Sequence, residues 1–281
     1  MDNNFKDKTV IITGGSLGVG AATAVRFADA GANLVLVARS KKNLERMAEK
    51  LRPKTRVETV SMDVTDTTAC MNLFKKAEFE FGGIHILVNN AGFHERGPAE
   101  NVAADDLGKI IDVNLKAPVI LSRLAIPYLR KSGGGAIINV GSLAGRTPVP
   151  GAATYSASKA GLRAFTLSLA DELREAQIKV AVLSPGPIDT GFIMSNIENV
   201  SDLTFSQPIC TADEVADEIM KLCFNDKRER SMPPISGFLT TMTYLFPGFG
   251  RMMRPLLESR GRRVKRKLIA QKRAAQEIAS G

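Results

Sequence analysis

Two groups of residues in this chain have the types and spacing of an active site. Tyr155 and Lys159 stand at i and i+4 of a helical pattern, which places a phenol and an ammonium on one helix face, one turn apart. The run Thr13-Gly14-Gly15-Ser16-Leu17-Gly18-Val19-Gly20 follows an apolar strand and opens a helix. Glycines permit a tight turn there, and a helix N-terminus offers free N–H groups to a pyrophosphate. The sequence therefore predicts a dinucleotide site beside an acid/base pair.

Each group also has an ordinary explanation when it stands alone. A glycine-rich string can be a plain strand-to-helix turn, and a Tyr/Lys pair can lie on an exposed helix. The repeated strand and helix pattern around the glycines favours the nucleotide site. Its expected contacts are Gly14, Ser16, Leu17, Gly18 and Gly20.

The end of the second expected strand favours a phosphorylated dinucleotide. The sequence there is Val37-Ala38-Arg39-Ser40, without the carboxylate that would bind the ribose 2′-hydroxyl of NAD. The guanidinium of Arg39 suits a 2′-phosphate through charge-assisted hydrogen bonds, and the Ser40 hydroxyl can donate to the same phosphate. The alternative is that Arg39 is a solvated loop charge. The predicted cofactor is NADP(H).

The elements that position these groups alternate along the chain. Short β-branched runs are interrupted by helical patterns such as 19–30 and 42–51, as in βαβ units whose parallel sheet is covered on both faces. We therefore predict an α/β fold with one doubly wound sheet. The expected strands are 9–12, 33–38, 57–62, 84–89, 136–140 and 179–183.

The composition changes at about residue 230, where we place the end of a catalytic domain, 1–230, and the start of an extension, 231–281. The net charge is +9, and ten Lys and Arg against two acidic residues after Gly250 account for nearly all of it. Because the basicity belongs to the tail, a nucleic-acid-binding domain is disfavoured. The segment 231–250 is uncharged but too interrupted by Pro and Gly to span a membrane, which needs about 20 apolar residues.

The tail itself has the pattern of a basic amphipathic helix. The apolar positions Met253, Leu257, Val264, Leu268 and Ala275 form a narrow stripe between many Arg and Lys residues. Such a helix can lie on an anionic membrane surface. It can also dock on its own domain or on a partner subunit, with its charged face in solvent.

The cysteines and the N-terminus indicate the compartment. Cys70, Cys210 and Cys223 are widely spaced and form no Cys/His ligand pattern, so neither a disulfide framework nor a metal site is expected. No secretory signal is recognised at the N-terminus. We expect a cytoplasmic protein, either free or peripheral at a membrane face.

The order and spacing of further motifs resemble those of the short-chain dehydrogenase/reductase family over roughly residues 6–230. The shared motifs are the TGxxxGxG of 13–20, Asn89-Asn90-Ala91-Gly92, Ser142 thirteen residues before Tyr155, the YxxxK of 155–159, and Ser184-Pro185-Gly186-Pro187-Ile188-Asp189-Thr190. The resemblance implies a Rossmann fold and a nicotinamide-dependent oxidoreductase, generally a homo-oligomer (a dimer or tetramer).

The resemblance also implies four catalytic residues: Asn114, Ser142, Tyr155 and Lys159. Tyr155 is expected to give a proton to the substrate carbonyl oxygen, and the Lys159 ammonium to favour its phenolate and to hold the nicotinamide ribose. Ser142 is expected to orient the substrate oxygen, and Asn114 to continue a proton relay from Lys159 through water.

The remaining expected cofactor contacts follow from the same resemblance. Asp63 and Val64 would lie at the adenine, Asn90, Ala91 and Gly92 at the adenosine and its ribose, and Pro185, Gly186, Ile188 and Thr190 near the nicotinamide. Segment 191–208 is expected to be a mobile, apolar substrate loop. His94, two residues after Gly92, has no ligand partners in the sequence; we expect a solvated or structural histidine, the alternative being that it faces the entrance of the cleft.

Three functions stay open at this point. The favoured one is an NADP(H)-dependent reductase of a hydrophobic ketone, because the tail is similar to that of relatives acting on steroids or long-chain lipid ketones. The second is a 3-oxoacyl-[acyl-carrier-protein] reductase whose basic tail docks an acidic carrier. Many soluble members of the family end with a glycine-rich stretch that this C-terminus lacks, and this difference disfavours the second function. The third is a non-catalytic NADP(H)-binding, membrane-associated protein.

Overall fold

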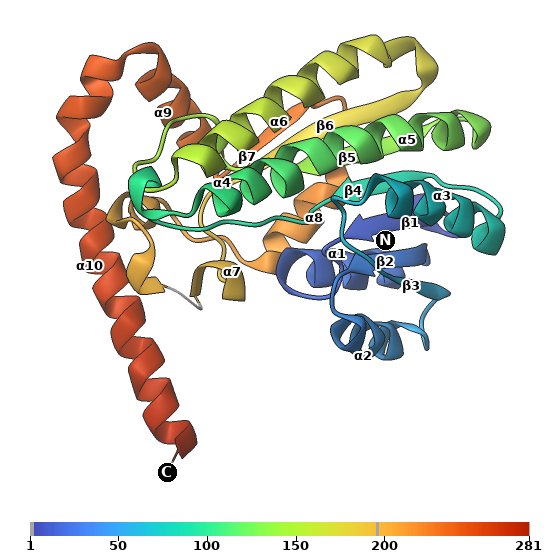
Figure 1. Cartoon of the computed structure of the whole chain (residues 1–281), viewed down its shortest axis with the longest axis horizontal. Coiled ribbons are helices and arrows are strands. Elements are labelled where there is room, and N and C mark those ends of the chain that lie inside the picture. The colour runs from blue at the N-terminus through green and yellow to red at the C-terminus, as the bar shows by residue number, and fades with distance from the viewer. Residues whose placement is uncertain (1–2, 195–196, 281) are drawn as a thin grey trace.

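The computed structural model describes residues 3–194 and 197–280, and the side chains of 4–194 and 197–271. Its centre is a seven-stranded sheet in the order β3-β2-β1-β4-β5-β6-β7, in which every neighbouring pair is parallel (Figure 1). The strands are β1 (Thr9–Thr13), β2 (Asn33–Ala38), β3 (Val57–Ser61), β4 (Ile86–Asn89), β5 (Gly135–Val140), β6 (Ile178–Pro185) and β7 (Glu229–Met232).

Helices cover both faces of this sheet, which explains why the central strands are apolar runs. Along β1, Val10 and Ile12 face one buried cluster together with α1 and α8, while Ile11 faces the other together with α3 and α5. The helices are α1 (Gly18–Asp29), α2 (Lys41–Leu51), α3 (Thr67–Phe81), α4 (Ala104–Ile111), α5 (Ala117–Lys131), α6 (Ala153–Glu172), α7 (Gly191–Met194), α8 (Ala212–Leu222), α9 (Pro234–Leu245) and α10 (Pro247–Ser280). The predicted doubly wound α/β fold is confirmed.

The seventh strand was not among the predicted elements. β7 pairs with β6 at the sheet edge, and it continues to Met232, past the expected domain boundary at residue 230. Its sequence, Glu229-Arg230-Ser231-Met232, is too polar to resemble a buried strand. Edge position explains this, because all four residues are only half-buried.

The C-terminal extension is a helical hairpin of α9 and α10 that stands at one end of the molecule (Figure 1). Helix α10 docks on segment 191–208, the expected substrate loop, through the stripe residues Val264 and Leu268. These pack with Ile269 against Ile193, Ile197, Val200 and Phe205. This part of the predicted stripe therefore lies on its own domain, one of the two expected arrangements. The side chain of Ala275 lies outside the described residues.

Polar contacts hold the same helix in place. Arg262 donates to Asp202 at 3.1 Å, and the Lys265 ammonium donates to the carbonyls of Glu198 and Val200, each at 2.7 Å. At Gly261 a Cβ would stand 1.8 Å from the Asp202 carbonyl oxygen, so only glycine permits this approach. Within the described residues, no helix combines the length and the apolar character that crossing a membrane requires.

Candidate active site

The predicted site lies where the strand order reverses, between β1 and β4, the place at which open α/β sheets bind ligands. Thr13, at the end of β1, joins the two strands. Its hydroxyl oxygen accepts hydrogen bonds from the N–H groups of Asn90 at 2.9 Å and Ala91 at 3.0 Å. The Asn90 side chain in turn donates to the Thr13 carbonyl at 2.9 Å. The Asn-Asn-Ala-Gly segment is thus fixed beside the glycine-rich turn.

The glycine-rich turn has the geometry of a pyrophosphate cradle. Gly14 and Gly18 adopt φ of +65° and +53°, which side chains rarely allow. A Cβ at Gly20 would lie 2.1 Å from the Gly14 carbonyl oxygen, so the first turn of α1 packs on the loop only without a side chain. The N-cap residue of α1, Leu17, makes no side-chain capping bond. The residues present therefore fit a bound phosphate group.

The ends of β2 and β3 supply the other predicted nucleotide contacts. Arg39 is exposed and lines the same cavity as the glycines. Ser40 caps α2 by accepting from the Asn43 N–H at 3.3 Å, so a second helix N-terminus opens there. Asp63 accepts from the Thr65 N–H at 2.9 Å and from its hydroxyl at 2.8 Å. Asn43, which the sequence analysis did not single out, also lines this end.

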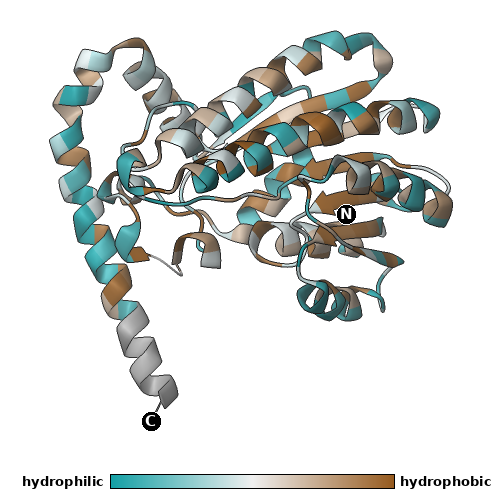
Figure 2. Ribbon diagram, in the orientation of Figure 1, coloured by the Kyte–Doolittle hydropathy of each residue, from teal (hydrophilic) through white to brown (hydrophobic). Residues whose placement is uncertain are grey.

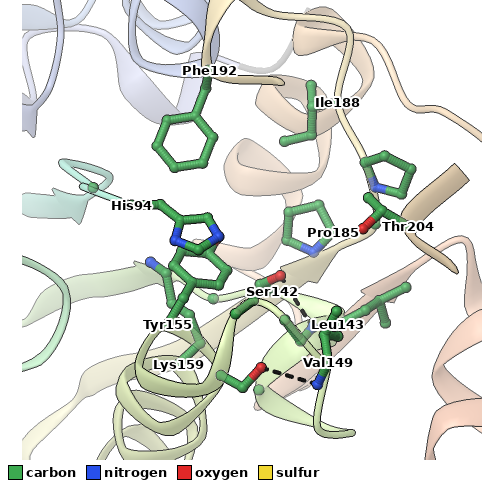
Figure 3. Close-up of a pocket in the computed structure, with 18 of the residues that line it drawn as sticks. His94, Ser142, Leu143, Val149, Tyr155, Lys159, Pro185, Ile188, Phe192 and Thr204 are labelled. Carbon is green, nitrogen blue, oxygen red and sulfur yellow. Dashed lines mark hydrogen bonds between the residues drawn. The ribbon is translucent and has the colours of Figure 1, made fainter. Parts of the chain in front are cut away.

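Three of the four expected catalytic residues meet at the N-terminal end of α6 (Figure 3). Tyr155 and Lys159 are one turn apart on this helix, and Ser142 follows β5, where its oxygen accepts from the Ala144 N–H at 3.1 Å. Burial raises the pKa of the Tyr155 phenol, while a hydrogen bond with the Ser142 side chain and the charge of Arg96 act in the opposite direction. The phenol is therefore protonated at neutral pH.

Lys159 is buried, and this burial lowers its pKa to about 8. Its ammonium donates to the Val140 carbonyl oxygen at 2.8 Å and lies 5.9 Å from the centroid of the Tyr155 ring. Below pH 8 the lysine thus keeps a positive charge next to the phenol, held by the last residue of β5.

Asn114 sits in a single π-helical turn, Asp112–Lys116, between α4 and α5. Its amide is fully engaged: the oxygen accepts from the Phe93 N–H, the nitrogen donates to the Phe93 carbonyl, both at 2.8 Å, and a further bond reaches Ser158. The side chain therefore anchors the loop after β4. The proton-relay role stays a prediction.

That loop brings two residues to the site that the sequence analysis did not assign to it. His94 stacks on Tyr155, and Figure 3 shows it between Tyr155 and Phe192. Burial and, to a smaller extent, the charge of Arg96 lower the pKa of His94 to about 3. The Arg96 guanidinium lies 5.7 Å from the Phe192 ring centroid and donates to the Phe192 carbonyl at 3.2 Å. In the sequence, the feature that could have indicated this role is the position of both residues in the loop that follows the carboxyl end of β4.

One cavity of about 1810 Å³ contains both the glycine cradle and the predicted catalytic residues Ser142, Tyr155 and Lys159. Of the predicted site residues, only Gly20 and Asn114 do not line it, since they support its walls from behind. Beyond Tyr155 its wall is mainly apolar and comes from the loop before α6, the substrate loop and the α9–α10 hairpin. The large apolar residues of this wall include Val149, Phe192, Leu203, Leu239, Phe249, Met253 and Leu257.

A partly buried ion-pair cluster connects this hairpin to the loop of Ser142. Arg146, four residues after Ser142, binds Glu229 of β7 and donates to the Thr241 hydroxyl of α9 at 2.7 Å. Arg163 of α6 makes two more bonds to the same carboxylate, at 2.6 and 2.7 Å. Burial alone would raise the pKa of Glu229, but the hydrogen bonds from the two arginines hold it below its usual range. The hairpin is therefore positioned together with the site.

Comparisons with known proteins give consistent results. The short chain dehydrogenase family matches residues 8–201. Sulfoacetaldehyde reductase 2 of Chromohalobacter salexigens is 38% identical over 187 residues, 66% of this chain and 74% of that protein. An uncharacterized oxidoreductase of Staphylococcus saprophyticus is 37% identical over 212 residues, 74% of this chain and 83% of its own.

Solved structures agree with these sequence matches. The crystal structure of levodione reductase superposes with a TM-score of 0.76 at 26% identity, covering 83% of this chain and 98% of that chain. A putative short-chain alcohol dehydrogenase from Sinorhizobium meliloti 1021 gives 0.74 at 28% identity, covering 82% and 96%. Both matches use nearly all of the other protein and leave a part of this chain without a counterpart.

Proposed function

The chain belongs to the short-chain dehydrogenase family and is an oxidoreductase of that type, and from this premise we propose that it uses NADP(H) to interconvert a ketone and a secondary alcohol on a hydrophobic substrate. The observation that carries the proposal is the single cavity. It joins a glycine cradle to Tyr155 and Ser142, and it continues into an apolar wall.

Members of this family use nicotinamide cofactors, and the proposal of NADP(H) over NAD(H) rests on Arg39. Arg39 directly follows β2 and lines the cavity, and the N-terminus of α2 lies beside it. Both features favour a phosphate, and no carboxylate stands at the end of β2 to repel one. The cradle of Gly14, Gly18 and Gly20 would hold the pyrophosphate, as in the geometry described above.

When bound, NADPH supplies a hydride to the substrate carbonyl carbon. The protein's residues manage the proton. The raised pKa of Tyr155 keeps a proton on the phenol oxygen, ready for transfer to the carbonyl oxygen. Ser142 orients that oxygen, and the nearby charges of Lys159 and Arg96 favour the phenolate that remains after transfer.

The proposed substrate class, a lipid- or steroid-like ketone, rests on the lining beyond the catalytic group. Phe192, Leu239 and Leu257 give this wall an apolar character that suits a large hydrophobic molecule. Sulfoacetaldehyde reductase, a relative, is named for a small aldehyde that carries a sulfonate. Arg96, Arg251 and Arg254 also line this cavity and can bind such an anion, but most of the wall is apolar, so we favour the hydrophobic ketone.

The other two functions receive less support. Helix α10 packs on the substrate loop, which leaves less of the basic tail to dock an acidic carrier protein. A non-catalytic role leaves the assembly of Ser142, Tyr155 and Lys159 in one cavity unexplained. The cytoplasmic location and the homo-oligomer stay predictions. Peripheral membrane binding also stays a proposal, but the stripe of α10 that first suggested it is partly used within the chain.

A panel of apolar ketones and alcohols, assayed for change in NADPH and NADH, tests the proposed function. We expect turnover of apolar ketones with NADPH, and we expect Tyr155→Phe to lower it about 10²- to 10⁴-fold while NADPH affinity is kept. A Tyr155→Phe variant with more than about a tenth of the wild-type rate would show that the phenol is not the proton donor.

A further inference from the structure

Exposed apolar side chains gather on one small part of the molecule. Fourteen large hydrophobic side chains are exposed among the described residues, and nine of them lie between Ile235 and Leu256. A patch this concentrated on a soluble fold marks an interaction site. We call these nine residues the apolar corner: Ile235, Phe238, Leu239, Tyr244, Leu245, Phe246, Phe249, Met252 and Leu256.

The apolar corner is formed by α9 and the first turns of α10, at the end of the molecule away from β3 (Figures 1 and 2). It differs from the stripe of Val264 and Leu268, which lies further along α10 and packs on the substrate loop. Phe246 and Met252 are 60% and 69% exposed, so they have little to do with the stability of the hairpin. Because exposed apolar side chains of this size are unfavourable in water, we expect them to contact a partner.

The cavity that holds Tyr155 extends to this corner. Leu239, Tyr244 and Phe249 are exposed and also line the cavity that holds Tyr155. An apolar molecule that leaves a hydrophobic phase at the corner would therefore reach the catalytic group without crossing water. The cavity thus connects the apolar corner to Tyr155.

The charges around the corner point to the kind of partner. No charged residue occurs from Ser231 to Gly250, and the chain after Gly250 has ten basic and two acidic residues. Arg251, Arg260, Arg263, Arg266 and Lys267 are all exposed on α10. An uncharged apolar edge bordered by bases is complementary to an anionic bilayer, whereas two copies of the same basic surface would repel each other.

We propose that the apolar corner docks on an anionic membrane, with its side chains at the boundary between headgroups and acyl chains, and that the cavity takes its substrate from there. Docking is interfacial, since none of the described helices can span the bilayer. The inference deepens the proposed function and rests on it for the identity of the substrate. The docking itself is measured without turnover, so the two can fail independently.

Vesicle co-sedimentation of the full chain tests the docking. The double variant Phe246→Ser with Met252→Ser removes two corner side chains that do not line the cavity. Its matched control, Phe79→Ser with Met71→Ser, removes an exposed phenylalanine and an exposed methionine from α3, away from the apolar corner. With phosphatidylcholine vesicles containing phosphatidylserine at low salt, we expect the corner variant to bind at least about tenfold more weakly than wild type and control.

The charge requirement has its own matched pair. Arg263→Gln, Arg266→Gln and Lys267→Gln together should weaken binding to anionic vesicles, and binding should fall with added salt. The same change at Lys41, Lys42 and Lys50 of α2, which are also exposed, should not. Arg262 and Lys265 are left unchanged because they hold the substrate loop.

A fluorescence probe measures insertion directly, because the chain contains no tryptophan. The emission of Phe246→Trp should shift to shorter wavelength with anionic vesicles and be quenched by brominated acyl chains, and that of Phe79→Trp should not change. Equal pelleting of the corner variant and its control, or no pelleting of the wild type, overturns the proposal. The proposal is also overturned if the wild type self-associates without binding vesicles and the corner variant no longer self-associates, since the corner would then be a subunit interface.

Discussion

The imidazole ring of His94 lies flat against the phenol ring of Tyr155, with 4.4 Å between the ring centroids and 20° between the planes. The Phe192 ring lies 6.4 Å from the same phenol. The Tyr155 phenol therefore has rings from two different segments beside it, one after β4 and one after β6. The two rings contribute to the burial that raises the pKa of the phenol.

The stacked ring should matter for catalysis through its shape and not through its charge. We expect His94→Ala to lower kcat/KM about two- to tenfold, because stacked aromatic pairs are worth about 0.5–1.5 kcal/mol. His94→Phe keeps the stack and should stay near the wild-type value. Steady-state kinetics of the three proteins decide this, and an unimpaired His94→Ala would contradict a positioning role.

The pH dependence separates this role from acid/base chemistry by the histidine. With a pKa lowered to about 3, His94 is neutral throughout the range from pH 5 to 8. The pH–rate profiles of wild type and His94→Phe should then have the same shape in that range. A limb that disappears in His94→Phe would show that the imidazole titrates in the reaction.

The sequence was informative where function depends on neighbours along the chain. The glycines at 14, 18 and 20 form one turn, and Tyr155 and Lys159 share one helix face, so spacing alone placed them. The doubly wound sheet followed from the strand and helix alternation. These predictions depend on local geometry, which the spacing of residues along the chain reflects directly.

What the sequence did not reveal depends on contacts between distant segments. The position of His94 against Tyr155 is set by Asn114, which holds Phe93 from another element. The apolar spacing of α10 identified the apolar face of the helix, but it could not show that Val200 and Phe205 cover part of it. β7 was missed because its polar side chains reflect an edge position and the binding of Glu229 by two arginines.

Gly145 provides a second prediction, since it lies directly against Lys159. A Cβ at position 145 would stand 2.6 Å from the carbonyl carbon and oxygen of Lys159, both of them backbone atoms. Gly145→Ala should force the loop of Ser142 away from α6 and lower kcat at least about tenfold, because small misplacements in a site are costly. Nucleotide affinity should change little, since the glycine cradle lies in the turn from β1 to α1.

A matched control for Gly145→Ala is Gly108→Ala in α4. Apart from its chain neighbours and the backbone of its own helix, no heavy atom of the described residues lies within 4 Å of the Cβ that this change adds, and alanine favours a helix over glycine by about 1 kcal/mol. We expect Gly108→Ala to keep full activity and to unfold at a slightly higher temperature. Equal kinetics of the two variants would mean that the loop adapts to the added methyl group.

Lys159 leads to a prediction about stability and pH. Its pKa is about 8 in the folded protein against 10.5 for a free side chain, so the unfolded state binds more protons between these values. The free energy of unfolding contributed by this group therefore rises from pH 8 to 10.5, and its full cost is present below pH 8. A difference of this size corresponds to about 3 kcal/mol.

Lys159→Met should remove that cost while abolishing activity. The variant also loses the hydrogen bond to the Val140 carbonyl, worth about 1 kcal/mol, so we expect a net stabilisation of about 1–2 kcal/mol at pH 7. Denaturant unfolding at pH 7 and pH 10 measures it. The gain should be smaller at pH 10, and a gain that is independent of pH would show that packing, not charge, is its source.

The last prediction concerns the choice of cofactor. Arg39 is exposed at the end of β2, within the cavity and next to the capped N-terminus of α2. Charge-assisted hydrogen bonds are worth about 1.5–3 kcal/mol, so Arg39→Ala should weaken NADPH binding about ten- to a hundredfold and NADH binding much less. Lys50→Ala, an exposed base at the far end of the same helix, should leave both affinities unchanged. Because the site is exposed, the preference for NADPH should also decrease with added salt. Fluorescence titration of both nucleotides measures these affinities, and equal binding of NADPH and NADH by the wild type would reject the assignment of Arg39 to a 2′-phosphate.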